Sequence, residues 1–376
     1  MIDSETGRPV LKRRKGKERT ASAVELERLV IQRRREVSLL DIVTRAAHWV
    51  PWWRRFGPLS GSDPRLKEPL ARYSVVTFTY GTNMGPAQMS RHLRGAVSPP
   101  EISAPGNKHI TANNLVKASG DITDEYMTLD VAQMWGDGSR VGVDGTQIDT
   151  WDDNLLAETS VRYGGYGGIA YRHIADSYIA LFSRFIPCGV WEAVYVFEGL
   201  LDHQAESVTI EQIHGDTQGQ SLPVFRLATM LGVELLPRIR NWKDLIFYKH
   251  SANVGFAHIG PLFGDDDVIN WQLSEDHFID LMRVMISIRE GKISSSVLLR
   301  RLGNESRKNR IYKAFRELGR AVRTITLLRY LSEPELRESI TAITNRVEAF
   351  HGFSKRLGFG HDGVLEDNDP TTWRSW

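Results

Sequence analysis

The stretch SRVGVDGTQI, residues 139–148, decides the fold of this chain of 376 residues. Its apolar residues recur with the spacing of a β-strand. Two further runs of this kind follow, GGIAYRHI at 167–174 and SYIALFSRFI at 177–186, and glycine-rich turns separate them. We therefore expect three successive strands in this part of the chain.

Beyond these strands the pattern alternates between helix and strand. We expect a helix over 190–201, a strand over 208–214, a helix over 222–231 and a short strand over 234–239. Three strands followed by alternating helix and strand predict a mixed α/β sheet with helices packed on it. From about residue 240 to residue 357 the pattern predicts mainly helix.

The part that precedes the strands reads as helical. Residues 12–35 hold ten basic and three acidic side chains; we expect a flexible arm, followed by an amphipathic helix from about Ser22. Residues 63–130 are predicted to be mostly helical, with a break across 99–106. The segment HWVPWWRRF at 48–56 has two readings: a hydrophobic plug that anchors a loop, or a surface that stacks on bases beside phosphate-binding arginines.

Composition excludes several classes of protein. With 41% hydrophobic and 25% charged residues, the chain has ordinary globular usage. Its single cysteine, Cys188, excludes a disulfide framework and a cysteine-rich zinc site, and it fits the reducing cytoplasm. The most apolar stretch, 178–201, contains Arg184 and Glu192, so we expect no membrane span. The sequence also lacks a P-loop, a G-x-S-x-G elbow and an H-E-x-x-H zinc helix.

The net charge of +2 argues against a nucleic-acid partner only if charge is evenly spread. It is not: residues 120–158 contain ten acids and one base, whereas residues 289–329 contain twelve bases and three acids. A charge run of this kind is most often a solvated surface, and the alternative is contact with phosphate groups.

Two aspartates stand where a metal site would be built. Asp144 interrupts an otherwise apolar strand, and Asp216 lies in a glycine-flanked turn directly after a strand, a common place for ligand-binding groups in α/β sheets. A later glutamate on a helix would complete a magnesium site of oxygen ligands. Glu348 is the best candidate, because its helix carries an apolar face made of Ile340, Ile343, Val347 and Phe350.

At these residues the sequence closely resembles the transposases of the Tn3 family, which serve replicative, cointegrate-forming bacterial transposons. The similarity extends from about residue 5 to about residue 360. The blocks that carry it are YGTNMGPAQ (80–88), WGDGSRVGVDGT (135–146), the stretch 154–201, IHGDTQGQS (213–221), LLPRIRNWKDL (235–245), the stretch 299–324, LLRYLS (327–332) and TNRVEAFHGFSK (344–355).

The resemblance implies a ribonuclease-H-like catalytic core of the DDE type, with a helical insertion between the second aspartate and the glutamate. The family's D-G-T block falls on Asp144, its H-x-D-T-Q-G block on Asp216 and its T-N-x-x-E-A-F block on Glu348. Asp137, in W-G-D-G, is a nearby competitor for the first position. The three carboxylates would hold two Mg²⁺ ions, which activate water to nick transposon 3′ ends and then let the 3′-hydroxyl attack target DNA.

The resemblance also implies DNA, at the transposon ends and the target, as the partner, and active complexes that are homodimers. The basic stretch would then contact the DNA backbone. Its proposed DNA-binding residues are Arg300, Arg301, Arg307, Lys308, Arg310, Lys313 and Arg316.

We expect five segments along the chain: 1–62 as basic arm and helical segment, 63–134 as helical region, 135–240 as the core, 241–332 as the helical insertion, and 333–376 as the completing helix and a divergent tail. Members of the family are longer on the N-terminal side, so we expect a copy that is truncated there and shortly after the glutamate. The alternative function is an inactive remnant that binds DNA or full-length transposase.

Overall fold

The computed structural model describes residues 9, 11, 19–61, 66–149, 157–161, 165–202, 204–240, 244–303, 310–359 and 364–365. The chain forms two compact units. The first, here called the core unit, comprises residues 1–13, 134–203 and 208–347. The second, here called the helical unit, comprises residues 14–133, 204–207 and 348–376.

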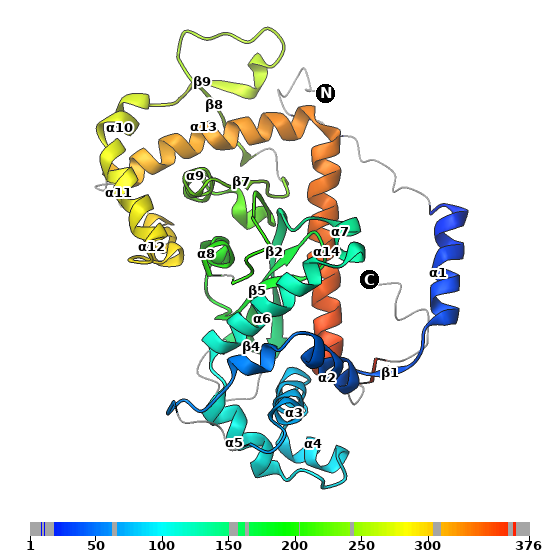
Figure 1. Cartoon of the computed structure of the whole chain (residues 1–376). Helices are drawn as coiled ribbons and strands as arrows, with labels where there is room; N and C mark the ends of the chain where they lie inside the picture. The colour runs from blue at the N-terminus through cyan, green and yellow to red at the C-terminus, as the bar shows by residue number, and fades with distance from the viewer. Residues whose placement is uncertain are drawn as a thin grey trace. The chain divides into compact units, whose positions relative to one another are not determined.

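The core unit is built on the predicted mixed sheet (Figure 1). Strand β2 (Arg140–Asp149) lies at its centre and pairs antiparallel with β4 (Gly165–Ala175). On its far edge β4 pairs antiparallel with β5 (Ala180–Pro187) and with the short β3 (Glu158–Ser160). The three strands expected from the sequence are therefore confirmed.

On its other edge β2 forms a parallel pair. It pairs with β6 (Gln212–His214), which pairs in turn with β7 (Glu234–Leu235). Helix α9 (Leu222–Leu231) connects these two strands, as a parallel connection requires. Antiparallel strands on one side of the central strand and parallel strands on the other make this an α/β, ribonuclease-H-like sheet. The predicted helix over 222–231 is confirmed, whereas the two parallel strands are shorter than predicted.

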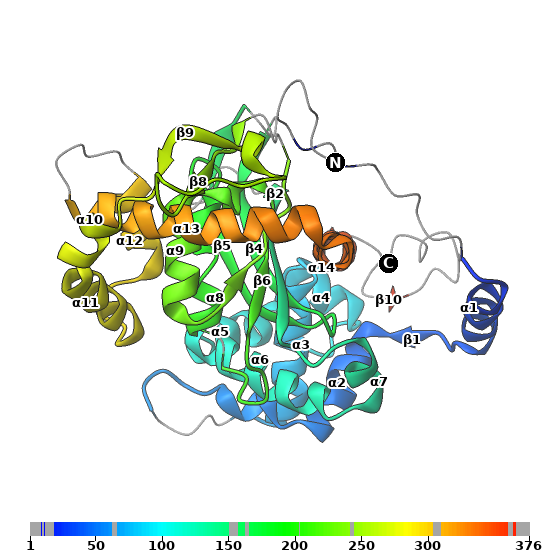
Figure 2. The same ribbon diagram turned by 90° about the horizontal axis from the view of Figure 1, so that it is seen from above.

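Two long helices pack on this sheet (Figures 1 and 2). Helix α13 (Arg310–Ser332) lies along α9, and α14 (Pro334–Phe359) lies against β2. A Cβ atom on Gly142 of β2 would come closer than 3.0 Å to the Val347 side chain of α14. Glycine at this position thus lets the helix approach the strand closely.

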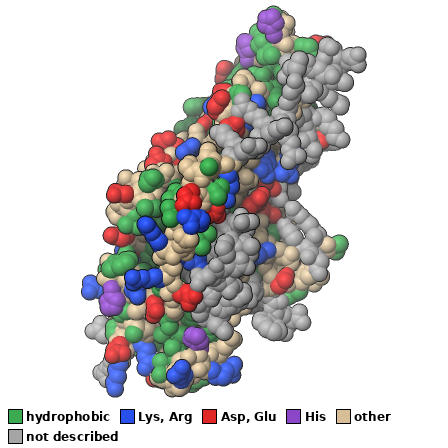
Figure 3. Space-filling model, turned by 90° about the vertical axis from the view of Figure 1, so that its right-hand side faces the viewer, with side chains coloured by type: hydrophobic (Ala, Val, Ile, Leu, Met, Phe, Trp, Pro, Cys, Tyr) green, Lys and Arg blue, Asp and Glu red, His purple; other side chains and the backbone are tan. Residues whose placement is uncertain are grey.

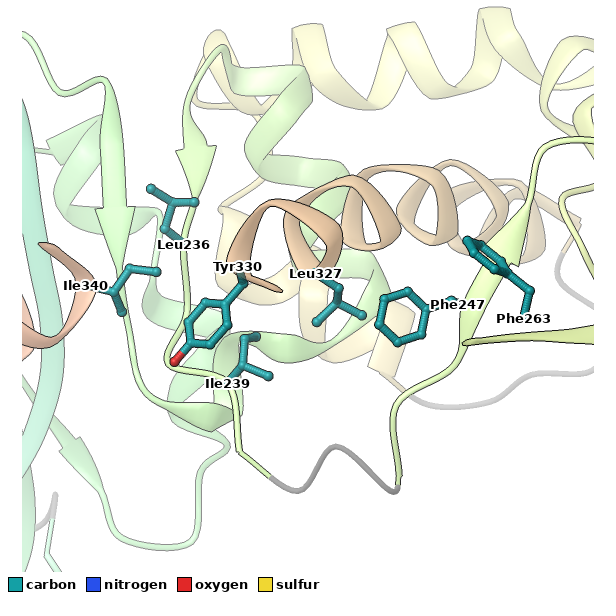
Figure 4. Close-up of a cluster of buried hydrophobic side chains, with 7 residues drawn as sticks. All are labelled: Leu236, Ile239, Phe247, Phe263, Leu327, Tyr330 and Ile340. Carbon is teal, nitrogen blue, oxygen red and sulfur yellow. The ribbon is translucent and has the colours of Figure 1, made fainter. Parts of the chain in front are cut away.

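An apolar cluster joins both helices to the sheet (Figure 4). Leu327 and Tyr330 of α13 lie between residues that follow β7 and the phenylalanines of the insertion, and Ile340 reaches in from α14. Burying such side chains contributes about 2 kcal/mol each. The buried members are Leu236, Ile239, Phe247, Phe263, Leu327, Tyr330 and Ile340.

The sequence pattern predicts mainly helix between the core strands and α13. In the structure this segment contains strands as well as helices. It contains the parallel pair β8 (Phe247–Lys249) and β9 (Phe263–Val268) before α10 (Trp271–Asp276), α11 (Phe278–Arg289) and α12 (Ser295–Gly303). Both strands are short, and β9 reads FGDDDV, which lacks the apolar alternation that identifies a strand.

The predicted helix over 190–201 is divided. A 3₁₀ turn, η2 (Glu192–Tyr195), precedes the short helix α8 (Glu198–Asp202). This interruption brings the side chain of Glu192 into the core, where it is 7% exposed.

The helical unit contains the elements on the N-terminal side. The predicted break across 99–106 is wrong, because a helix spans this stretch. Ser98 and Glu101 form a capping box at its start, and proline is favoured in a first turn. The helices of this unit are α1 (Ala21–Arg33), α2 (Leu39–Trp49), α3 (Pro69–Gly81), α4 (Pro86–His92), α5 (Pro99–His109) and α6 (Ala112–Met127), and α7 (Asp130–Trp135) begins in it.

The tryptophan cluster fits the plug reading for two of its three members. Trp52 is 3% exposed and packs edge-on against Phe56, and the Trp53 indole donates to the Ala47 carbonyl at 3.2 Å. Trp49 is 78% exposed. It is the member left available for the stacking reading, which stays a prediction.

Within the described ranges, no helix combines the length and the apolar character that crossing a membrane requires. On the face shown in Figure 3, acidic and basic side chains are interspersed over the described surface. Of the basic stretch at 12–35, residues 12–18 lie outside the described residues.

Candidate active site

Asp144 and Asp216 come together at the centre of the sheet. The parallel register of β2 and β6 ends with the pair Gly142 and His214, and Asp144 and Asp216 each follow that pair by two residues. Both line one narrow pocket with a free volume of about 10 Å³, close to what a single water molecule needs. Its lining consists of Val143, Asp144, Tyr171, Glu192, Ala193, Val196, Gly215, Asp216, Gly219 and Leu235.

Alternation along β2 assigns Asp144 a face. Gly142 points toward Ile343 and Val347 of α14, and residues two apart on a strand share a face. The Asp144 side chain therefore lies on the face that α14 covers, opposite the face of the pocket-lining residues Val143 and Tyr171. A Cβ atom on Gly145, on the opposite face, would come closer than 3.0 Å to the Glu192 carboxylate. Glycine next to Asp144 makes room for that second acid.

Tyr171 forms the base of the pocket from the neighbouring strand, opposite Gly145 in the register. Burial raises the pKa of its phenol well above the ordinary value, and the charges of Glu192, Asp216 and Asp144 raise it further. The phenol is thus held neutral, and the pocket has a concentration of negative charge. Hard divalent cations prefer oxygen ligands of this kind.

Glu192 is a site residue that sequence reasoning missed. It sits in the otherwise apolar run WEAVYVF, where a charge is as unexpected as Asp144 is in its strand. The charge was visible in the sequence, but a continuous helix over 190–201 did not indicate whether the Glu192 side chain points to the core or to solvent.

Asp137, the competitor for the first position, has a structural role. Its carboxylate accepts the backbone N–H of Ser139 at 2.9 Å. The Ser139 hydroxyl and backbone hold the pKa of Asp137 below its ordinary value. Asp137 is not among the residues that line the pocket, so the geometry favours Asp144.

Glu348 lies on α14 with its side chain exposed. The preceding turn of the helix is firmly held: Arg346 donates to the carbonyls of Asp176 and, at 3.3 Å, of Trp135, and its guanidinium lies 4.8 Å from the centre of the Tyr178 ring. Within the described part of the chain, no three His, Cys, Asp or Glu side chains gather closely enough to hold a metal ion. Asp144 and Asp216 thus line one pocket, and among the described residues no complete three-residue metal site forms around them.

A basic groove lies along α13. Arg310, Lys313, Arg316 and Arg320 recur at intervals of three and four residues and so share one face of the helix. They line a groove of about 610 Å³ together with residues of α10 and the turn that follows it. Two acids also line it, and one of them, Glu317, pairs with Arg320 at 2.9 Å.

The other predicted DNA-binding residues fall elsewhere. Arg300 donates to the Tyr195 hydroxyl and lies 5.6 Å from the centre of its ring, so α12 is tied to the core there. Arg301 is exposed. Arg307 and Lys308 lie outside the described residues.

His214 is fully buried on the strand before Asp216, and neither ring nitrogen has a hydrogen-bond partner. Burial, with a smaller effect of Arg140, lowers its pKa to about 4. The unfolded chain, with a histidine pKa of about 6.5, takes up this proton first as pH falls. Stability is therefore complete above about pH 7 and decreases through about pH 6.5 toward pH 4.

We expect this histidine to lower the free energy of unfolding by about 2 kcal/mol between about pH 7 and about pH 5. Urea unfolding at a series of pH values measures this change in the free energy of unfolding. EDTA is present throughout, so that metal binding does not contribute. His214→Leu should lose that portion of the pH dependence. An unchanged profile in the variant would show that the buried imidazole does not titrate as described.

A mixed sheet of this strand order, with helices packed on it, is that of a ribonuclease-H-like domain of the DDE class. Residues 41–376 match the family described as the Tn3 transposase DDE domain, and the chain belongs to that family. The resemblance seen in the sequence is therefore confirmed.

Individual relatives agree. The chain is 27% identical over 332 residues to the transposase for transposon Tn1546 of Enterococcus faecium, a match that covers 88% of this chain and 33% of the relative. It is 30% identical over 261 residues to the transposase for transposon Tn501 of Pseudomonas aeruginosa, covering 69% and 26%. The match to the transposase for transposon gamma-delta of Escherichia coli is 25% over 351 residues, covering 93% and 35%. The chain thus spans about a third of the length of these relatives.

Proposed function

We propose that this chain is the catalytic region of a DNA transposase, which nicks transposon 3′ ends and transfers the 3′-hydroxyl ends into target DNA during replicative transposition. The observation that supports this most is the meeting of Asp144 and Asp216 in one pocket at the centre of the sheet. The membership of the chain in the Tn3 transposase DDE domain family supports assigning this pair to the chemistry of the family.

The chemical character of the residues that line the pocket suits a divalent cation. Three acidic residues, Asp144, Glu192 and Asp216, are among those that line it, and Gly215 and Gly219 leave part of its wall without side chains. We propose that Asp144 and Asp216 hold Mg²⁺, with two ions in the active state. Bound there, Mg²⁺ would supply charge neutralisation and a polarised oxygen for in-line phosphoryl transfer.

Glu348 is the proposed third carboxylate. Val347, the residue before it, packs against Gly142, and Arg346 fixes the rotation of the same turn of α14 through two backbone carbonyls. A helix held this firmly can present a carboxylate with the precision that metal-assisted chemistry needs.

The basic groove is the proposed contact for the DNA backbone. Its cations stand about one helical turn apart along α13, and each can neutralise a phosphate group as it displaces condensed counterions. By family resemblance the DNA would be a transposon end or the target, bound by a homodimer that pairs two ends.

Replacing Arg310 and Lys313 together with glutamine is expected to weaken binding to a short DNA duplex and to flatten its salt dependence. Each lost phosphate contact reduces the slope of log K against log salt concentration by about 0.9, so the double variant should lose about 2. Fluorescence anisotropy over a salt series measures both slopes. Arg28→Gln, on exposed α1, should leave the slope as it is; an unchanged slope in the double variant would remove the groove from the DNA interface.

One assay tests the proposed function. The chain is incubated with pre-nicked transposon-end DNA, target DNA and either Mg²⁺ or EDTA. Joined products that form only with the metal support the enzyme. Retarded DNA without any joined product would instead support the alternative of a DNA-binding remnant.

A further inference from the structure

The turn that carries Asp216 is held from outside the sheet by α13. After Asp216 the chain forms a single 3₁₀ turn, η3 (Thr217–Gln220), closed by a hydrogen bond from Gly219 N–H to the Asp216 carbonyl at 3.3 Å. Only this turn separates Asp216 from α9. The position of the Asp216 carboxylate therefore depends on what fixes the turn.

Arg323 of α13 contacts the end of this turn. Its Nη1 donates to the Gln220 carbonyl at 3.3 Å, and its Nη2 donates to the Ile246 carbonyl at 3.5 Å. The guanidinium thus links the turn after Asp216 to the segment that leads into β8. On the other side of the turn, the Gln220 side chain donates to the Arg238 carbonyl at 2.9 Å.

The backbone of α13 is equally close. A Cβ atom on Gly319, one helical turn before Arg323, would come closer than 3.0 Å to the carbonyl oxygen of Leu222, the first residue of α9. Gly319 therefore sets the helix directly against the end of the turn. This contact brings the Arg323 guanidinium within reach of the Gln220 carbonyl.

The ring of Tyr248 steadies the guanidinium. Arg323 lies 6.0 Å from the ring centre, and Arg320, which lines the basic groove, lies 4.6 Å from it. A cation over an aromatic face is attracted by the negative charge of the ring face. The Tyr248 ring thus contacts both an arginine that lines the groove and the arginine that holds the turn after Asp216.

We propose that Arg323 is a positioning residue, which holds the turn Asp216–Gln220 so that the Asp216 carboxylate is preorganised for a divalent cation. The inference rests on the proposed function, because it concerns the metal site proposed there. Arg323 acts through the backbone of the turn and does not contact the cation. Groups that orient metal ligands in this way commonly change metal affinity 10- to 100-fold when they are removed, by rough estimate.

The test compares Arg323→Gln, Arg323→Lys and the control Arg329→Gln, which removes an arginine further along the same helix that pairs with Glu234 and Glu333. Mn²⁺ affinity is titrated by electron paramagnetic resonance, without DNA. We expect about tenfold weaker binding in Arg323→Gln, partial recovery in Arg323→Lys because it keeps a charged donor, and no change in Arg329→Gln. Hydrogen exchange should speed up in the peptide covering 217–222.

Strand transfer supplies the second readout. Arg323→Gln should bind DNA as tightly as the unmodified chain but react more slowly, and raising Mn²⁺ should restore its rate; a merely unfolded variant would not recover. Unchanged Mn²⁺ affinity in both Arg323 variants, or equal loss in Arg329→Gln, would overturn the inference. Mn²⁺ binding that persists in Asp216→Asn would instead contradict the proposed function.

Discussion

Replacing Asp216 with asparagine is expected to lower the strand-transfer rate about 10³-fold, while the protein stays folded. A metal ion held by carboxylates stabilises the developing charge of phosphoryl transfer by several kcal/mol, and each 1.4 kcal/mol is about a factor of ten in rate. Asparagine keeps the size of the side chain but removes its charge. Asp144, which lines the same pocket, should behave alike.

The matched control for this variant is Asp137→Asn, in the loop just before β2. Asp137 accepts a hydrogen bond from Ser139 N–H and does not line the pocket, so the variant should transfer strands at nearly the unmodified rate. Joined products are quantified on gels under single-turnover conditions. If Asp137→Asn proved inactive and Asp144→Asn active, the first carboxylate would be misassigned.

The second large effect concerns stability. Gly319→Ala would place a methyl group against the backbone carbonyl of Leu222, which cannot move aside without displacing α9. Overpacking of this kind costs about 3 kcal/mol, more than the roughly 1 kcal/mol that alanine adds to helix propensity. We expect a lower free energy of unfolding by about 2 kcal/mol, and a melting temperature lower by roughly 6 °C.

Gly352 of α14 provides the opposite case. It also lies within a long helix, but a Cβ atom there would meet open space. Gly352→Ala should therefore stabilise the chain, by about 0.5 to 1 kcal/mol. Chemical denaturation measures both variants; similar shifts in the two would mean that α13 does not lie against α9 as described.

The sheet was predictable because its signals are local. Asp144 stands out as a charge within an apolar strand, and the helix over 222–231 shows a regular apolar period. The strands β8 and β9 were not predictable, since their short sequences carry charge instead of alternation. The capped helix over 99–109 was not predicted because its prolines favour a break; Pro99 and Pro100 lie in its first turn, where proline is tolerated, but Pro105 lies inside it.

The site was predictable in part. Sequence blocks pointed to Asp144, Asp216 and Glu348, which stay predictions, and the charge of Glu192 within an apolar run was visible but was not used. The basic stretch was visible in composition, yet composition could not tell its arginines apart. Arg320 lines the groove, whereas Arg323 contacts the turn after Asp216. The close packing of Gly319 against α9 determines which face of α13 lines the groove and which face contacts the turn.

We propose that Asp144, Asp216 and Glu348 together hold one divalent-cation site. Replacing Mg²⁺ with Fe²⁺ and generating hydroxyl radicals at the bound iron cuts the backbone close to the ions. Cuts are expected near all three residues; excess Mg²⁺ should suppress them and Asp216→Asn should abolish them. Cuts confined to the two aspartate segments, with none near Glu348, would contradict the proposal.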